Sequence, residues 1–105
     1  MKLKEGNELY VRIDYKAGEK EETEQDALDS MAYSQKISKE RYLLAGLFGE
    51  METGKIDGAM LIFEAKDFEE AEKIAYNDPI IERGFYRCEL HKWNIVLSSE
   101  GIVEQ

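Results

Sequence analysis

The stretch YNDPIIERGFYRCELHKW, residues 76–93, holds the side chains of this sequence that are best suited to acid–base chemistry. Asp78 stands directly before the only proline, and His91 is the only histidine. A carboxylate in a pocket can move protons near neutral pH when its pKa is raised, and imidazole titrates there without perturbation. Asp78 is therefore a candidate catalytic base and His91 a candidate partner. The structural alternative is that Asp-Pro only ends a helix and that His91 is a polar residue on a strand edge.

Four further side chains are candidates for the lining of a pocket. Asp29 could face Asp78, because two facing carboxylates raise the pKa of one of them. Tyr15 and Tyr33 could supply hydroxyl donors, and Trp93 could stack on a substrate. The structural alternatives are a solvated aspartate in the first turn of a helix, amphipathic tyrosines at the border of a small core, and a tryptophan that anchors a core or a dimer interface.

The composition argues against metal and cofactor sites. Cys88 is the only cysteine, so the chain cannot form an internal disulfide or a cysteine-clustered zinc site. No carboxylate cluster accompanies His91 at a spacing typical of metal ligands. The glycines lack the lysine and the strand-to-helix context of a phosphate-binding loop. We therefore expect neither a metal nor a cofactor.

Length and charge restrict the class of protein. The 105 residues are enough for one domain, and a formal net charge of −9 opposes binding to nucleic acid. No apolar stretch is long enough to span a membrane or to act as a signal sequence, so we expect a cytoplasmic protein without nucleic-acid or membrane partners. The acidic segment 19–26 leaves open another possibility, an accessory subunit that acts only through its surface.

Two helices and four strands are predicted to position these side chains. The alternating LYVRID at 9–14 predicts the first strand, and residues 23–39 the first helix. Residues 41–50 are apolar on both faces, which predicts a central strand, and residues 58–64 form the next strand in a hairpin with it.

The clearest signals for where helices and strands begin and end lie in the second half of the chain. Asp67 is a candidate N-cap with Glu70 at the capping-box position, and Pro79 stops this second helix. Residues 86–96 predict the last strand of a core that spans about 8–96. Residues 97–105 are either a tail or an extra edge strand.

The predicted order βαββαβ favours an α+β, ferredoxin-like fold with a four-stranded antiparallel sheet and two helices on one face. Residues 58–64 carry apolar side chains on both faces of their strand. Because the helices cover only one face of the sheet, we expect a homodimer that packs through the other.

Four stretches, LLAG (43–46), DGAMLIFEA (57–65), DFEEAEKIAYNDPIIERGFY (67–86) and CELHKWNIV (88–96), resemble the YCII-related family of the dimeric α+β barrel superfamily. The resemblance implies a ferredoxin-like protomer that pairs its sheet with a partner's, and a small pocket between sheet and helices. The superfamily includes lactone isomerases, monooxygenases and a dehydrochlorinase, so the fold does not select a reaction.

In this family a histidine on the first helix and the aspartate of the Asp-Pro motif are thought to act as an acid–base pair. Asp78 matches the aspartate, but the histidine should fall near Asp29, and residues 19–39 contain none. The usual Arg-Pro of the last strand has become His91-Lys92. We therefore expect a YCII-like small-molecule-binding protein with lost or weak catalysis. The alternative is a cofactor-free enzyme for proton transfer, isomerisation or elimination that uses Asp78.

Overall fold

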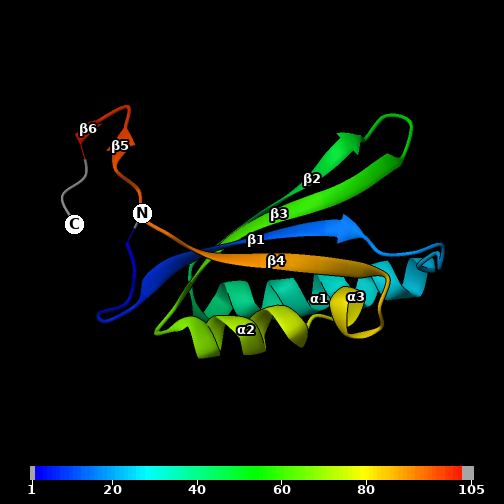
Figure 1. Ribbon diagram of the computed structural model, residues 1–105, viewed down its shortest axis with the longest axis horizontal. Helices are drawn as coiled ribbons and strands as arrows, with labels where there is room; N and C mark the ends of the chain where they lie inside the picture. Colours follow the sequence, from blue (N-terminus) through cyan, green and yellow to red (C-terminus); the bar gives the residue numbers. More distant parts are fainter. Residues whose placement is uncertain (1, 103–105) are drawn as a thin grey trace.

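The computed structural model describes residues 2–102, which form a four-stranded antiparallel sheet of order β2-β3-β1-β4 with helices on one face (Figure 1). The predicted ferredoxin-like α+β fold is confirmed. The helices and strands are β1 (Glu8–Lys16), α1 (Glu24–Glu40), β2 (Leu43–Glu50), β3 (Lys55–Ala65), α2 (Phe68–Tyr76), α3 (Pro79–Glu82), β4 (Tyr86–Trp93), β5 (Leu97–Ser98) and β6 (Gly101–Ile102).

Both long helices begin at side chains that bind their first free backbone N–H groups. Thr23 accepts a hydrogen bond from the N–H of Asp26 and donates its own N–H to the Asp26 carboxylate. Asp67 caps α2, as predicted, by accepting from the N–H of Glu70 at 2.8 Å. Glu70 does not complete the capping box, because its carboxylate accepts instead from the N–H of Lys66.

The prediction that β2 is central was wrong, because β2 lies at an edge of the sheet beside β3. Most of its side chains are exposed. The apolar side chains on its two faces have different surroundings. Ala45 and Leu47 line a cavity on the helix side, whereas Leu44 and Phe48 alternate with them and face the other way.

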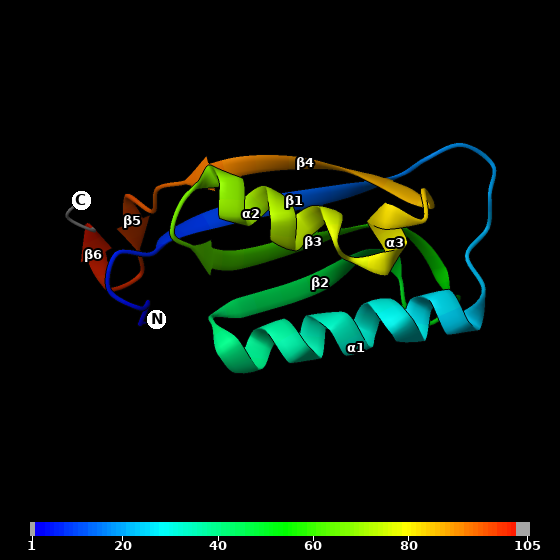
Figure 2. The same ribbon diagram turned by 90° about the horizontal axis from the view of Figure 1, so that it is seen from below.

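β1 turns its polar face toward the helices. Tyr10, Arg12 and Asp14 are buried on this side, where the Tyr10 ring packs against Phe63 and Phe68. The main hydrophobic cluster lies on the same side and comprises Tyr10, Phe63, Ala65 and Ala71. In Figure 2, which is seen from the helix side, α1 runs along the β2 edge of the sheet, whereas α2 and α3 lie in front of the sheet between α1 and β4.

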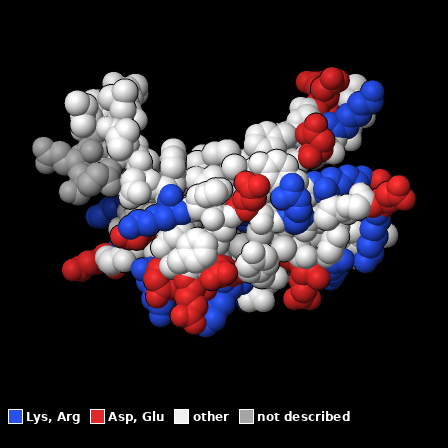
Figure 3. Space-filling model, viewed as in Figure 1, with Lys and Arg blue, Asp and Glu red and all other residues white. Residues whose placement is uncertain are grey.

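The opposite face of the sheet is not covered by a helix (Figure 1). In Figure 3 the surface along this side is largely uncharged between the tip of the β2–β3 hairpin and the β5–β6 hairpin, whereas charged side chains gather around the helices. Residues 97–98 and 101–102 pair only with each other and do not extend the main sheet. The last residues of the predicted tail, 103–105, lie outside the described residues. Within residues 2–102, no helix is long and apolar enough to cross a membrane.

Candidate functional site

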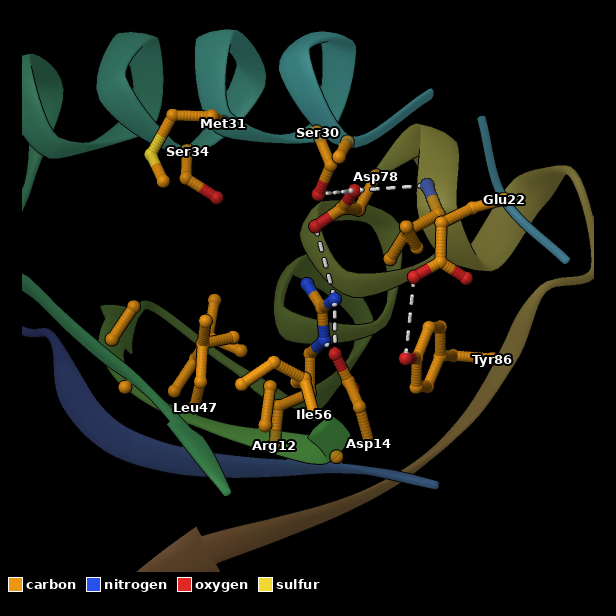
Figure 4. Close-up of a pocket in the computed structure, with 17 residues that line it drawn as sticks. Arg12, Asp14, Glu22, Ser30, Met31, Ser34, Leu47, Ile56, Asp78 and Tyr86 are labelled. Atoms are coloured by element: carbon orange, nitrogen blue, oxygen red, sulfur yellow. Dashed lines mark hydrogen bonds and ion pairs between the residues drawn. The ribbon is translucent and has the colours of Figure 1, made fainter. Parts of the chain in front are cut away.

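A cavity of about 330 Å³ lies between the helix side of the sheet and α1 (Figure 4). Charged side chains from three different parts of the chain meet at one end of it. The rest of the wall is mainly apolar, with Ala27, Met31, Ala45, Leu47, Ile56, Leu61 and Ile80 among its residues. This combination of apolar walls with a few convergent polar groups is typical of small-molecule sites.

The charged end is built around Arg12. Because Arg12 and Asp14 are two residues apart on β1, their side chains share a face. Arg12 donates from Nε and Nη2 to the two carboxylate oxygens of Asp14, each at 2.7 Å, and Nη2 lies 2.9 Å from Oδ2 of Asp78. All three residues are at most 3% exposed. One guanidinium therefore holds two buried carboxylates together.

Asp78 links three elements at this point. Its Oδ1 accepts from the Ser30 hydroxyl on α1 at 2.7 Å and from the N–H of Ile80 at 3.1 Å, which caps α3. Pro79 occupies the first turn of α3, where its missing N–H costs nothing. Asp78 thus has the backbone bond expected of a structural Asp-Pro turn, and it also lines the cavity.

Burial and pairing act in opposite directions on the two ionisable residues of β1. Burial raises the pKa of Asp14, and the hydrogen bonds and positive charge of Arg12 oppose this without cancelling it. Burial alone would lower the pKa of Arg12, but Asp14 and Asp78 raise it above its usual value. Arg12 is therefore charged at neutral pH. The pKa of Asp14 therefore lies above the usual value of an aspartate.

The segment that enters α1 contributes a third carboxylate. Glu22 lines the cavity, and its Oε1 lies 3.5 Å from the Tyr86 hydroxyl (Figure 4). Burial, followed by the nearby charge of Glu22, raises the pKa of Tyr86. Oε2 of Glu22 is buried and has no hydrogen-bond partner among the described residues. Part of the acidic segment 19–26 therefore belongs to the rim of the cavity.

The structure does not bring His91 to Asp78 within the protomer. His91 pairs with Val11 across the β1–β4 ladder, which places its side chain on the uncovered face of the sheet. Its side chain is 61% exposed and lies 3.7 Å from Glu89. The sheet thus separates the imidazole from the cavity.

Asp29 on α1 is the candidate to face Asp78, but the α1 residue that contacts Asp78 is the next one along the chain. Asp29 accepts from Gln25 and forms an ion pair with Arg83 at 2.9 Å, and these contacts lower its pKa. The neighbouring Ser30 is the residue of α1 that reaches Asp78.

The aromatic candidates also lie outside the cavity wall. The Tyr33 hydroxyl donates to the carbonyl of Ile74 at 2.8 Å and so ties α1 to α2. Tyr15 and Trp93 lie on the uncovered face of the sheet, where Arg87 stacks over the Tyr15 ring.

Sequence reasoning did not select Arg12, Asp14 or Ser30. The signal for the first two is the spacing of opposite charges at i and i+2 in LYVRID, which places them on one strand face. Ser30 carries no such signal. No group of three or more histidine, cysteine or acidic side chains within residues 2–102 could hold a metal ion.

Comparison with known proteins places this site in a family. A family model of the YCII-related domain matches residues 9–94. Among solved structures, the fold is similar to that of 5-chloro-2-hydroxyhydroquinone dehydrochlorinase from Burkholderia phenoliruptrix in complex with 2,5-dihydroxybenzoquinone. The TM-score is 0.58 and the identity 17%, over 88% of this chain and 98% of that one. No curated protein matches. Since the family match spans most of the chain, the protein belongs to the YCII-related family.

Proposed function

We propose that this chain binds a small organic molecule in the cavity between the sheet and α1, with lost or weak catalytic activity. The observation that carries the proposal is the buried Arg12–Asp14–Asp78 cluster at the end of an otherwise apolar cavity. At about 330 Å³ the cavity falls at the lower end of the range of roughly 300–1,000 Å³ that ligand pockets occupy. The related dehydrochlorinase fold, solved with a bound quinone, adds support from a protein of similar architecture.

The hydrogen bonding of Asp78 argues for weak catalysis. Its two oxygens accept from the Ser30 hydroxyl, the N–H of Ile80 and the Arg12 guanidinium. A carboxylate has about four acceptor sites, so these contacts leave little of Asp78 free to take a proton from a substrate. No imidazole lines the cavity to take over this task.

A fragment screen by thermal shift tests the binding proposal with ring-sized aromatic and lactone compounds. Ser34 lines the cavity from α1, so Ser34→Phe should fill it and abolish the stabilisation by every hit. Gln35→Phe is the matched control, because Gln35 is the next residue and is exposed. The proposal fails if no fragment raises the melting temperature, or if the hits stabilise Ser34→Phe as much as Gln35→Phe.

A second candidate function is proton transfer, isomerisation or elimination on the bound molecule. It is favoured by two buried carboxylates, Asp14 and Asp78, that lie together in the cavity wall, and burial raises the pKa of Asp14 in the direction that suits proton transfer. A hit incubated with the protein in D₂O should then exchange a carbon-bound proton, and Asp78→Asn should slow the exchange. Unchanged NMR spectra of every hit after prolonged incubation would exclude this activity for those compounds.

We also propose that two copies pair through the uncovered sheet faces. This face carries exposed Leu44 and Phe48, and a shallow apolar groove runs along Leu44, Met60 and Ile62. Light scattering should find a dimer at micromolar concentration. Leu44→Lys should produce a monomer, whereas Leu28→Lys, at an equally exposed leucine of α1, should not. A monomeric wild type would refute the pairing. The cytoplasmic location stays a prediction from the sequence.

A further inference from the structure

The charges around the cavity narrow the chemical class of its ligand, an inference that rests on the proposed function. The charged residues in the lining are Arg12, Asp14, Glu22 and Asp78. Arg12 is already paired with two carboxylates, and Glu22 forms no ion pair within residues 2–102. An anionic ligand would therefore meet more negative than positive charge and no free cation. Asp14 and Asp78 are buried, so little water screens the repulsion of a further negative charge placed beside them.

Arg12 keeps one nitrogen, with its two N–H groups, available to a ligand. Its Nε and Nη2 bind Asp14 and Asp78, and Nη1 takes part in none of these contacts. In Figure 4 the Arg12 nitrogen without a dashed line lies on the side of the cavity where Leu47 and Ser34 are drawn. A guanidinium N–H can only donate, so the ligand atom that meets it must be an acceptor.

A hydroxyl group on the ligand carries no negative charge and also supplies the acceptor that Arg12 requires. Its oxygen can accept from Nη1 of Arg12, and its proton can be donated to a carboxylate or to the Ser34 hydroxyl. An ammonium group offers no acceptor to Nη1 of Arg12, although the net negative charge of the lining would attract it. A carboxylate offers acceptors, but it adds a negative charge beside Asp14 and Asp78.

The walls set the size and polarity of the rest of the ligand. An apolar cavity of roughly 150 Å³ holds a benzene ring, so about 330 Å³ has room for a ring with a short substituent. We propose that the cavity takes an uncharged alcohol or phenol of this size, with its hydroxyl at Arg12, and rejects carboxylates of the same shape.

Two probes with the same ring test this selectivity, namely benzyl alcohol and benzoate. Each is titrated into the wild-type protein at neutral pH, and its dissociation constant is measured from amide chemical shifts. We expect saturable binding of benzyl alcohol, and binding of benzoate weaker by about tenfold or more. Ser34→Phe should abolish the binding of benzyl alcohol.

Glu22→Gln tests whether charge is the cause. It removes one negative charge from the lining without removing a contact of Arg12, so it should reduce the discrimination against benzoate several-fold. Discrimination that does not change in this variant overturns the electrostatic explanation.

The outcomes separate this inference from the proposed function. Tighter or equal binding of benzoate overturns the ligand class and leaves the binding function standing. Binding of benzyl alcohol that survives Ser34→Phe overturns the placement in the cavity. If neither probe binds, the ligand class is wrong, and the binding function also fails if the fragment screen yields no hit.

Discussion

Replacing Arg12 with methionine should destabilise the protein far more than the loss of a surface arginine. Arg12→Met preserves an unbranched side chain but leaves Asp14 and Asp78 buried without their shared cation. Removing one partner of a buried ion pair costs about 3–5 kcal/mol, because the remaining charge stays desolvated. The structure places two carboxylates in this position, so we expect a loss at the upper end of this range at neutral pH.

The loss should depend on pH in a defined direction. Burial raises the pKa of Asp14 in the folded state, and Arg12 now holds it down, so Arg12→Met should raise it further. Between the ordinary and the raised pKa, the folded state binds more protons than the unfolded state, and stability therefore falls as pH rises. The deficit of Arg12→Met relative to wild type should be smaller at about pH 4–5 than at about pH 8.

Urea unfolding, followed by circular dichroism, measures this difference. Arg87→Met is the matched control, because Arg87 pairs with Glu89 at 3.8 Å on the surface and should contribute about 1 kcal/mol or less. Adding Asp14→Asn and Asp78→Asn to Arg12→Met should recover much of the loss, since it removes both buried charges. The account is refuted if Arg12→Met costs no more than Arg87→Met, or if its deficit does not shrink in acid.

Further predictions concern the supports of the site. Ser30→Ala should reduce the free energy of unfolding by about 1–2 kcal/mol, because the hydroxyl donates to the carboxylate of Asp78, and thermal unfolding measures the loss. Asp67→Ala should cost about 1 kcal/mol by removing the cap of α2, and an unchanged helix signal and stability would contradict that role. Gly49→Ala should be more damaging than Gly54→Ala in the same assay. Both glycines have positive φ, but only at Gly49 does an added Cβ lie within 4 Å of other atoms.

Local signals in the sequence were sufficient for most of the fold. The cap at Asp67, the stop at Pro79 and the hairpin of β2 and β3 all depend on neighbouring residues, and the structure contains each of them. The place of β2 in the strand order could not be predicted from neighbouring residues. A run that is apolar on both faces is typical of a central strand, yet β2 has one face on a cavity and the other uncovered.

The site was harder to predict because it joins residues that are distant along the chain. The alternation in LYVRID predicts a strand but not which of its faces meets the helices, and the structure turns Arg12 and Asp14 toward them. Burial of a charged pair on the helix side is explained only by Asp78, which arrives from α3. The Asp-Pro motif identified that aspartate, whereas the i and i+2 spacing of Arg12 and Asp14 places them on one strand face without indicating that Arg12 meets Asp78.

The central claim is that the cavity between the sheet and α1 binds a small molecule. A crystal structure of the protein soaked with the strongest fragment hit tests it most directly. We predict density for the fragment inside the cavity, with a polar atom within hydrogen-bonding distance of Arg12. Density found only on the uncovered sheet face, for example in the groove between Leu44 and Met60, would contradict the claim.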